Sequence, residues 1–519
     1  MTVTTLYRGG RFYSAAVPGA TAMLVTGDRI SWLGAAADAP AADRTVDVGG
    51  ALVAPAFVDA HVHCTDTGLA LSGLDLSAAR SAADVLAAVA SFAAGLPADA
   101  VVLGHGWDES TWPAGSRVPP DAAALDRAAG GRPVYLSQAS IHSALCSSAL
   151  LAAAPAVAGA AGYDVSGLVR RDAHHVVRAV AFGAVTPAQR RAAQVAALRR
   201  AAALGVAAVH ECGGPGTSSE ADFAGVLALS GDGLPEVYGY WGELMGAAKA
   251  RELGAVGAGG DLYADGALGS RTAHLSVDYA DGAGRGFGYL TGEQVRDHLL
   301  DCGRSGVQGG FHAIGDAAIA TVLAGFAGAA RVAGVEAVRA ARHRVEHAEV
   351  VDKRLIAGFV DFGVVVSVQP AFDRLWGGER QMYAQRLGVE RSLASNPLGA
   401  MHSVGVALAF GSDSPVTPLD PWGAVRAAVC HHNPVQRMSV RAAFAAHTRG
   451  GWRAVGGQPD AVGHGLLVPG APATFAVWAA PGGLSAGLPA LAGAGDEGPP
   501  PEPVCRATVL RGRLIFEGS

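Results

Sequence analysis

Two histidines at the end of an apolar run are the residues of this sequence best suited to chemistry. Residues 54–63 read APAFVDAHVH, and the run ends with His61 and His63, two positions apart. Alternate side chains of a β-strand share a face, so both imidazoles point to one side, while Cys64 points to the other. Two imidazoles on one face form half of a site for zinc or a similar ion. An isolated pair also arises by chance, so its meaning depends on partners elsewhere in the chain.

Three further residues of the ligand type follow or end short apolar stretches: His312, His347 and Asp413. Hydrolytic metal chemistry needs imidazoles and a carboxylate to hold the ion, an open position for water and a base beside that water. An aspartate at the edge of the metal can take the proton of the water and pass it to the leaving group. We therefore predict Asp413 as general base and metal ligand. His347 is the second catalytic residue, beside the developing oxyanion, and also a ligand.

The elements that must position these residues alternate between helix and strand. Stretches rich in alanine and leucine are separated by short apolar runs. The helical stretches are 82–94, 187–204, 292–302 and 317–329, and the runs are 206–209, 307–311, 364–368 and 406–410. This alternation predicts a parallel sheet with crossover helices. In a (β/α)₈ barrel the polar residues at the strand ends would meet at one rim. We predict an α/β fold with a TIM barrel over residues 55–455, with an inserted segment within about residues 66–200.

Both ends of the chain have a different pattern. Short β-like runs, such as residues 22–25, 30–33 and 474–478, are broken by glycine-containing turns. Matching ends around a different middle predict one small composite β-sandwich domain, built from residues 1–54 and 456–519.

The composition excludes several classes of function. The 519 residues are 50% hydrophobic and carry a net charge of −6, with no basic stripe, which argues against nucleic acid as a partner. No apolar run has membrane-spanning length, and the N-terminus lacks the pattern of a signal peptide. The six cysteines are scattered, so a disulfide framework is not expected. We expect a cytoplasmic protein with a small-molecule substrate and no membrane partner, and a homodimer is left open.

The sequence resembles the metal-dependent amidohydrolase superfamily, and within it the YtcJ-like branch that includes N-substituted formamide deformylases. The resemblance runs over nearly the whole chain. It is carried by residues 54–63, 106–109, 140–143, 209–211, 265–273, 311–316, 344–347, 367–370 and 411–416, of which 265–273 (DGALGSRTA) is the most branch-specific. It implies a TIM barrel with a composite β domain. It also implies that His61 and His63 come from the first barrel strand, His312 from the fifth, His347 from the sixth and Asp413 from the eighth.

One departure from the family pattern concerns the metal site. Many relatives carry a lysine four residues before the Asp265-Gly266 pair, where its carbamylated form bridges two metals, and this chain has Asp261 there. A short aspartate either reaches a second ion or leaves a single ion in place. The resemblance therefore implies a divalent metal, zinc in the first instance, with one or two ions and one favoured.

Five other residues are candidates for contact with substrate: His142, Trp107, Asp265, Arg271 and Gln369. A turn-forming role explains Asp265 and Arg271 equally well, because both lie in a glycine-rich stretch.

The function expected from the motifs is hydrolysis of a non-peptide carbon–nitrogen bond, in an amide, an N-substituted formamide or a cyclic amide. A metal-activated water would attack the carbonyl carbon. Deamination of a heterocycle at the same site is the alternative enzyme function. A non-catalytic binding scaffold is a third hypothesis, against which the full set of ligands and a positioned base argue.

Overall fold

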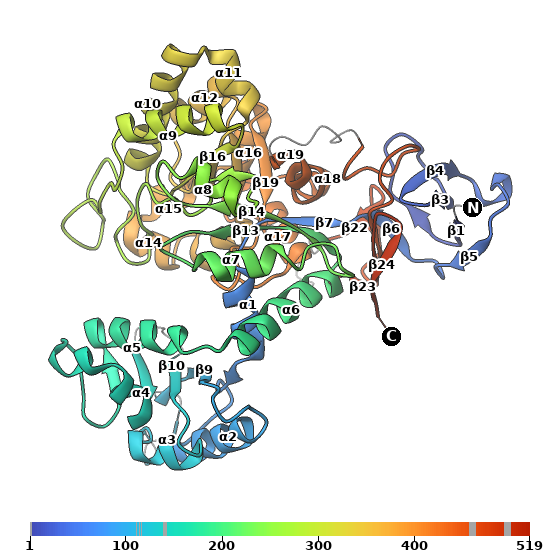
Figure 1. Ribbon diagram of the computed structural model, residues 1–519. Helices are drawn as coiled ribbons and strands as arrows, with labels where there is room; N and C mark the ends of the chain where they lie inside the picture. Colours follow the sequence, from blue (N-terminus) through green and yellow to red (C-terminus); the bar gives the residue numbers. More distant parts are fainter. Residues whose placement is uncertain are drawn as a thin grey trace. The chain divides into compact units, whose positions relative to one another are not determined.

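The computed structural model describes residues 3–109, 112, 113, 115, 117–138, 143–455, 463–491 and 500–518 (Figure 1). The chain forms two compact units. One contains Met1–His63 with Leu198–Ser519, and the other contains Cys64–Ala197. Each unit has its own sheets and its own apolar core.

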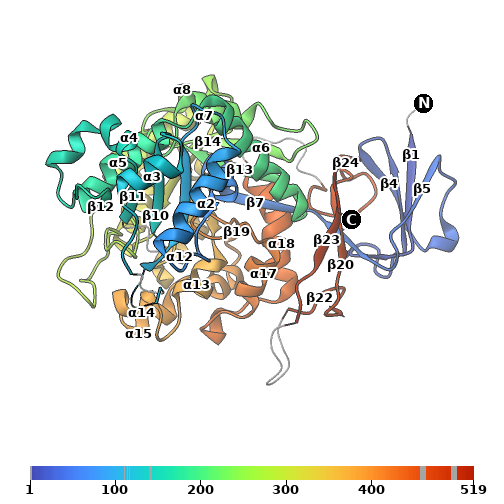
Figure 2. The same ribbon diagram turned by 90° about the horizontal axis from the view of Figure 1, so that it is seen from below.

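The larger unit is built on an eight-stranded parallel barrel. The strands, in chain order, are β7 (Phe57–Val62), β13 (Val206–Gly213), β14 (Glu236–Trp241), β15 (Gly257–Ala258), β16 (Gln308–Ala313), β17 (Arg344–His347), β18 (Val365–Val368) and β19 (Ala407–Phe410). Four of these strands are labelled in Figure 2: β7, β13, β14 and β19. The first and last strands are joined by a parallel bridge between Val62 and Ser414, and the Asp413 N–H donates to the His61 carbonyl at 2.7 Å. The predicted TIM barrel is therefore confirmed.

The barrel strands are buried on both faces, as is expected where helices cover a parallel sheet. All six residues of β7 and all eight of β13 are buried. The outer helices include α9 (Gly292–Ser305), α10 (Asp316–Ala333), α12 (Lys353–Phe362) and α17 (Pro421–Val429). Helix α9 begins with a capping box of Thr291 and Gln294 and ends at Gly306, whose φ of 66° suits glycine. Local sequence thus sets where this helix starts and stops.

Helix α10 is long and apolar enough to cross a membrane by length and composition, the one such helix in the described part of the chain. It buries Ile319, Val322 and Phe326, among other residues. A Cβ at Gly325 would lie 2.3 Å from Val295 Cγ1, so this glycine lets α10 approach α9 closely. Packing in the barrel wall therefore explains the apolar character of the helix.

Two smaller sheets complete this unit. The first has the order β4 (Arg29–Gly34), β3 (Ala22–Thr26), β1 (Thr4–Arg8), β5 (Arg44–Asp47). The second has the order β2 (Arg11–Phe12), β6 (Leu52–Pro55), β20 (Phe475–Ala479), β23 (Val504–Leu510), β24 (Arg513–Glu517). Strands from both chain ends pair directly, since β6 runs antiparallel to β20. Their shared core includes Met23, Ile30, Val53 and Phe475.

The unit Cys64–Ala197 has a five-stranded sheet with apolar clusters of its own. The strand order is β12 (Leu168–Arg170), β11 (Ser143–Cys146), β10 (Val134–Gln138), β9 (Val102–Trp107), β8 (Leu74–Asp75). One cluster contains residues of α2 (Ala82–Ala94) and α3 (Ala122–Ala128), and another contains residues of α5 (Arg171–Gly183). Successive side chains of β9 and β10 join one cluster and then the other, so this unit is a layered α/β structure.

Candidate metal centre

The carboxyl ends of the barrel strands bring six candidate ligands together. His61 lies on β7 with His63 just after it, Asp261 follows β15, His312 lies on β16, His347 ends β17 and Asp413 follows β19. These are the first, fourth, fifth, sixth and eighth strands of the barrel. All of these side chains are buried except that of His63, which is 16% exposed.

Asp261 lies at the middle of the cluster. Its Oδ1 is 3.5 Å from His61 Nε2, 3.5 Å from His312 Nδ1 and 3.8 Å from His347 Nε2, and its Oδ2 is 3.3 Å from His63 Nε2. The short side chain at the position of the family lysine therefore reaches every imidazole of the cluster.

Asp413 lies on one side of this cluster. Its Oδ1 is 3.2 Å from His63 Nε2 and 3.5 Å from His61 Nε2. Its backbone is left-handed, with φ of 53°, and so is that of His347, with φ of 69°. Such a conformation costs about 1 kcal/mol or more for a residue with a Cβ, and it is concentrated at functional sites.

Three histidines of the centre have one ring nitrogen engaged by an acceptor outside it. His61 Nδ1 donates to Glu346 Oε2 at 3.1 Å, His347 Nδ1 to Gln369 Oε1 at 2.9 Å, and His312 Nε2 to the Gly266 carbonyl at 3.2 Å. Because these partners are acceptors, the proton of each neutral ring lies on the outer nitrogen. The inner nitrogen of each ring therefore offers its lone pair to the centre of the cluster, the arrangement found around protein-bound metals.

The inner atoms of the cluster fit a cation. His61 Nε2, His312 Nδ1, His347 Nε2 and Asp261 Oδ1 are buried and have no hydrogen-bond partner among the described residues. Buried polar atoms without a partner are rare and destabilising, so four together call for a ligand. Three overlapping sets of atoms lie within 4.8 Å of one another: His61, His347 and Asp413; His61, His63 and Asp261; and Asp261, His312 and His347. Imidazole nitrogen and carboxylate oxygen are the donors that zinc-like ions prefer.

The electrostatics of the cluster favour positive charge. Burial lowers the pKa of the His63 imidazole, but the carboxylates of Asp261 and Asp413 outweigh it and raise that pKa well above its usual range. The same carboxylates raise the pKa of His347 to about 9 against the effect of burial. Burial raises the pKa of the Asp413 carboxyl, but the facing histidines, His63 first, bring it below its ordinary value. Protons and a divalent ion therefore compete for the same nitrogens.

A buried ion pair behind His61 was not predicted from the sequence. Arg344 donates through Nε to Glu346 Oε1 at 2.8 Å and through Nη2 to Glu346 Oε2 at 2.9 Å, and its Nη1 donates to His210 Nδ1 at 2.8 Å. Burial, and then the Arg344 charge, lower the pKa of His210 well below its usual range, so this imidazole is a neutral acceptor. The network holds the carboxylate that orients His61. The sequence did contain a signal for this ion pair, because Arg344 and Glu346 lie two positions apart on a short strand and so share a face.

Two further side chains near the centre were also missed. The Tyr263 hydroxyl donates to Asp261 Oδ2 at 3.3 Å, and its ring centroid is 4.8 Å from that of His312. The Asp59 carboxylate accepts from the backbone N–H groups of Ser412 at 2.9 Å and His61 at 3.2 Å. Burial raises the pKa of Asp59 to about 6. This aspartate ties the first barrel strand to the segment that carries Asp413.

Two of the predicted substrate-contact residues have structural partners at the centre. Asp265 is buried and accepts from the N–H groups of Ile314 at 3.0 Å, Gly315 at 2.8 Å and His274 at 2.8 Å, so it holds loops together. Gln369 is buried and orients His347, while its Nε2 has no partner among the described residues. Of these two residues, Gln369 is therefore the one with a polar side-chain atom available to a ligand among the described contacts.

The other three lie in different surroundings. Arg271 is 42% exposed and pairs with Asp281 at 2.8 Å. Trp107 lies in the core of the unit Cys64–Ala197, and its indole N–H donates to the Leu136 carbonyl at 2.8 Å. His142 lies outside the described residues. Contact of these side chains with substrate stays a prediction.

Comparison with known proteins gives matches over most of the chain. The model of the amidohydrolase family (Amidohydro_3) matches residues 44–516. The putative amidohydrolase YtcJ of Bacillus subtilis is 27% identical over 415 residues, which cover 74% of this chain and 74% of that protein. The Arabidopsis thaliana protein LONG AFTER FAR-RED 3 is 27% identical over 461 residues, 80% of this chain and 75% of that protein. A crystal structure of an uncharacterized metal-dependent hydrolase from Pyrococcus furiosus superposes with a TM-score of 0.75 at 24% identity, covering 91% of this chain and 98% of that one.

Proposed function

This chain belongs to the amidohydrolase family and is a hydrolase of carbon–nitrogen bonds. On that premise, we propose that it cleaves a small amide, an N-substituted formamide or a cyclic amide at the carboxyl end of its barrel. The observation that carries the proposal is the set of inward-facing ring nitrogens. Those of His61, His312 and His347 are buried without a partner among the described residues, while each opposite nitrogen donates to a fixed acceptor.

We propose that the six residues of the centre hold a divalent metal, with zinc the ion that suits their donors. When bound, such an ion lowers the pKa of a water molecule and polarises a carbonyl group. Asp261 belongs to two of the three candidate ligand sets, and these two share no other residue. This placement supports two ions with Asp261 as their common ligand, rather than the single ion favoured from the sequence.

Asp413 is the proton carrier in this proposal. Its carboxyl pKa is below its usual range because the neighbouring imidazoles outweigh burial, so the group is ionised and able to accept a proton at neutral pH. The Oδ1 atom of Asp413 is the one that faces His61 and His63. We therefore place the proton taken from the attacking water on Oδ2. From there the proton passes to the leaving nitrogen, which would otherwise depart as an unstable anion.

The other residues orient and stabilise. Gln369 fixes the ring of His347 by accepting its Nδ1–H. Positive charge at the metal centre would stabilise the carbonyl oxygen of the substrate as that oxygen gains negative charge. Glu346 fixes His61 in the same way. The left-handed backbone at Asp413 and His347 maintains two side chains in positions that relaxed strand ends would not give them.

The test is a substrate screen on zinc-loaded protein. N-formyl amines, N-acyl amines and cyclic amides would be incubated with the enzyme, and amine, carboxylate and ammonia would be quantified. Amine and carboxylate in equal amounts support the proposal. Ammonia released from a heterocycle would instead support the deaminase alternative, and no turnover by metal-loaded protein on any compound class would refute the proposed substrates.

The metal assignment has its own test. The double substitution His61→Ala with His63→Ala should remove bound metal, as measured by elemental analysis, and leave the circular dichroism spectrum of the barrel largely unchanged. His402→Ala is the matched control, because His402 is an exposed histidine on α16 (Leu398–Ser403), away from the six residues. Full metal occupancy in the double variant would refute the assignment.

A further inference from the structure

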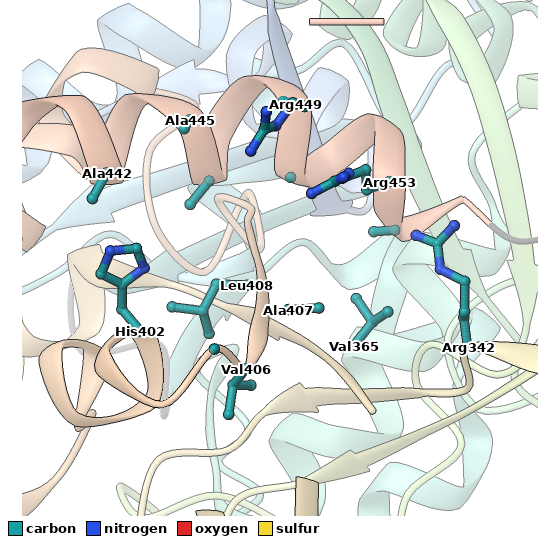
Figure 3. A pocket seen from close by; sticks show the side chains of 14 residues that line it. Arg342, Val365, His402, Val406, Ala407, Leu408, Ala442, Ala445, Arg449 and Arg453 are labelled. Carbon is teal, nitrogen blue, oxygen red and sulfur yellow. The ribbon is translucent and has the colours of Figure 1, made fainter. Parts of the chain in front are cut away.

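A cavity of about 360 Å³ lies at the amino ends of β18 and β19 (Figure 3). Its wall includes Val365, the first residue of β18, and Val406, which directly precedes β19. Asp413 follows the opposite end of β19, so this cavity is separate from the metal centre by the length of the strand. The volume falls within the range of sites for small molecules, about 300–1,000 Å³.

Three arginines are among the residues that line this cavity. In Figure 3, Arg449 and Arg453 extend into it from one helix and Arg342 reaches in from the strand side. In the described part of the chain, no ion pair or hydrogen bond engages these three guanidinium groups, and the described lining contains no carboxylate. His402 adds a fourth nitrogen-bearing side chain at the rim. The lining therefore concentrates positive charge that no carboxylate among the described residues neutralises.

The backbone beneath these arginines is irregular. Arg342 is a non-glycine residue in the left-handed conformation, with φ of 52°, directly after α11 (Val335–Ala341). Glycine or asparagine would occupy that position with less strain. Arg449 lies in a π-helical turn, Ala446–Gly450, between α18 (Val440–Ala445) and α19 (Gly451–Ala454). Turns of this type are rare and often occur at functional sites.

Two of the arginines, Arg342 and Arg453, also repel one another. Burial lowers the pKa of the half-buried Arg342. The Tyr240 side chain acts in the opposite direction, and the charge of Arg453 lowers this pKa further. Like charges held close together oppose folding, and an anion between them offsets the repulsion. An occupant with negative oxygens would remove this repulsion.

We propose that this cavity binds a small organic phosphate, with its phosphoryl group on Arg342, Arg449 and Arg453 and its apolar portion on the aliphatic wall. Planar guanidinium groups match the oxygens of phosphate in pairs of hydrogen bonds. The opposite wall is apolar, formed by Val365, Leu408 and several alanines, and a bare inorganic ion would leave it uncovered.

Calorimetric titration of the full-length, metal-loaded protein tests the proposal with three probes: inorganic phosphate, phenyl phosphate and benzoate. We expect phenyl phosphate to bind most tightly, since it satisfies both walls, inorganic phosphate to bind more weakly, and benzoate weakest. Tighter binding of benzoate than of phenyl phosphate would overturn the assignment to phosphate. No saturable binding of any probe up to about 10 mM would overturn the site itself.

Variants locate the binding. Arg449→Ala and Arg453→Ala should each weaken phenyl phosphate binding by about 10-fold or more, the value of a hydrogen bond to a charged group. Arg449→Lys should recover part of the loss, because it keeps the charge but not the fork. Arg331→Ala, an exposed helical arginine outside the cavity, is the matched control and should change affinity less than twofold. Equal losses in Arg331→Ala and the cavity variants, all with unchanged melting temperature, would show non-specific attraction and overturn the proposal.

Discussion

Replacing Asp261 with asparagine should weaken metal binding while leaving the barrel folded. The substitution keeps the size of the side chain and removes one negative charge, which lies 3.3–3.8 Å from an inner nitrogen of each of the four histidines. At about 4 Å and an effective dielectric constant of about 20, one charge interacts with a monovalent cation by about 4 kcal/mol, and with a divalent cation by about twice that. Even if desolvation cancels three quarters of the larger value, about 2 kcal/mol remains, which is about a 30-fold loss of affinity.

The assay is titration of metal-free protein with zinc in competition with a fluorescent chelator, with elemental analysis of the loaded protein for stoichiometry. We expect at least the 30-fold loss for Asp261→Asn, and a fall in stoichiometry from two ions towards one. The matched control is Asp281→Asn, which removes a carboxylate that pairs with Arg271 and Arg386 away from the centre. If Asp261→Asn matched the wild type in affinity and stoichiometry, Asp261 would not be a ligand and the electrostatic reasoning would be refuted.

Three other predictions follow from the same geometry. Asp413→Asn should retain most of the metal yet lower kcat by at least about 10²-fold, and a variant both metal-loaded and active would move the role of base to His347. Gln369→Leu removes the acceptor for the His347 Nδ1–H and should weaken zinc binding 10- to 100-fold in the chelator assay, whereas unchanged affinity would exclude this positioning role. Burial, aided by the charge of His298, lowers the pKa of His343 to about 4. Between pH about 6.5 and 4 the unfolded chain therefore binds this proton and the folded chain does not, so acid should destabilise the wild type relative to His343→Gln by up to about 3 kcal/mol in urea unfolding. A stability difference independent of pH would contradict the last prediction.

The ligand-bearing strand ends could be predicted because they depend on local sequence. The spacing of His61 and His63 sets their common face, and the apolar runs before His312 and Asp413 are long enough to be barrel strands. Parallel strands present their carboxyl ends at one rim, so alternation of helix and strand brings these residues to the same edge. The same logic did not find the sheet of the unit Cys64–Ala197, because its strands are only two to six residues long and lie among alanine-rich helices.

The outer partners of the histidines could not be predicted in this way. Glu346 lies 285 residues from His61 in the sequence, and its carboxylate reaches that ring only because β17 and β7 are both strands of the closed barrel. Gln369 looked like a substrate contact, since a polar residue after an apolar strand is compatible with either role. Its bond to His347 depends on the stagger between neighbouring strands, which the sequence pattern does not contain.

Residue types and strand ends were therefore determined by the sequence alone, and the barrel with its histidines and aspartate follows from them. The radius and stagger of the closed barrel decide which ring nitrogen of each histidine faces inward. They also decide whether the short side chain of Asp261 reaches the four histidines. The cluster of Arg342, Arg449 and Arg453 has the same origin, because residues more than 100 positions apart converge only when the last helix covers the amino ends of β18 and β19. Distances across a closed ring are set by all eight strands together, and no local pattern carries that information.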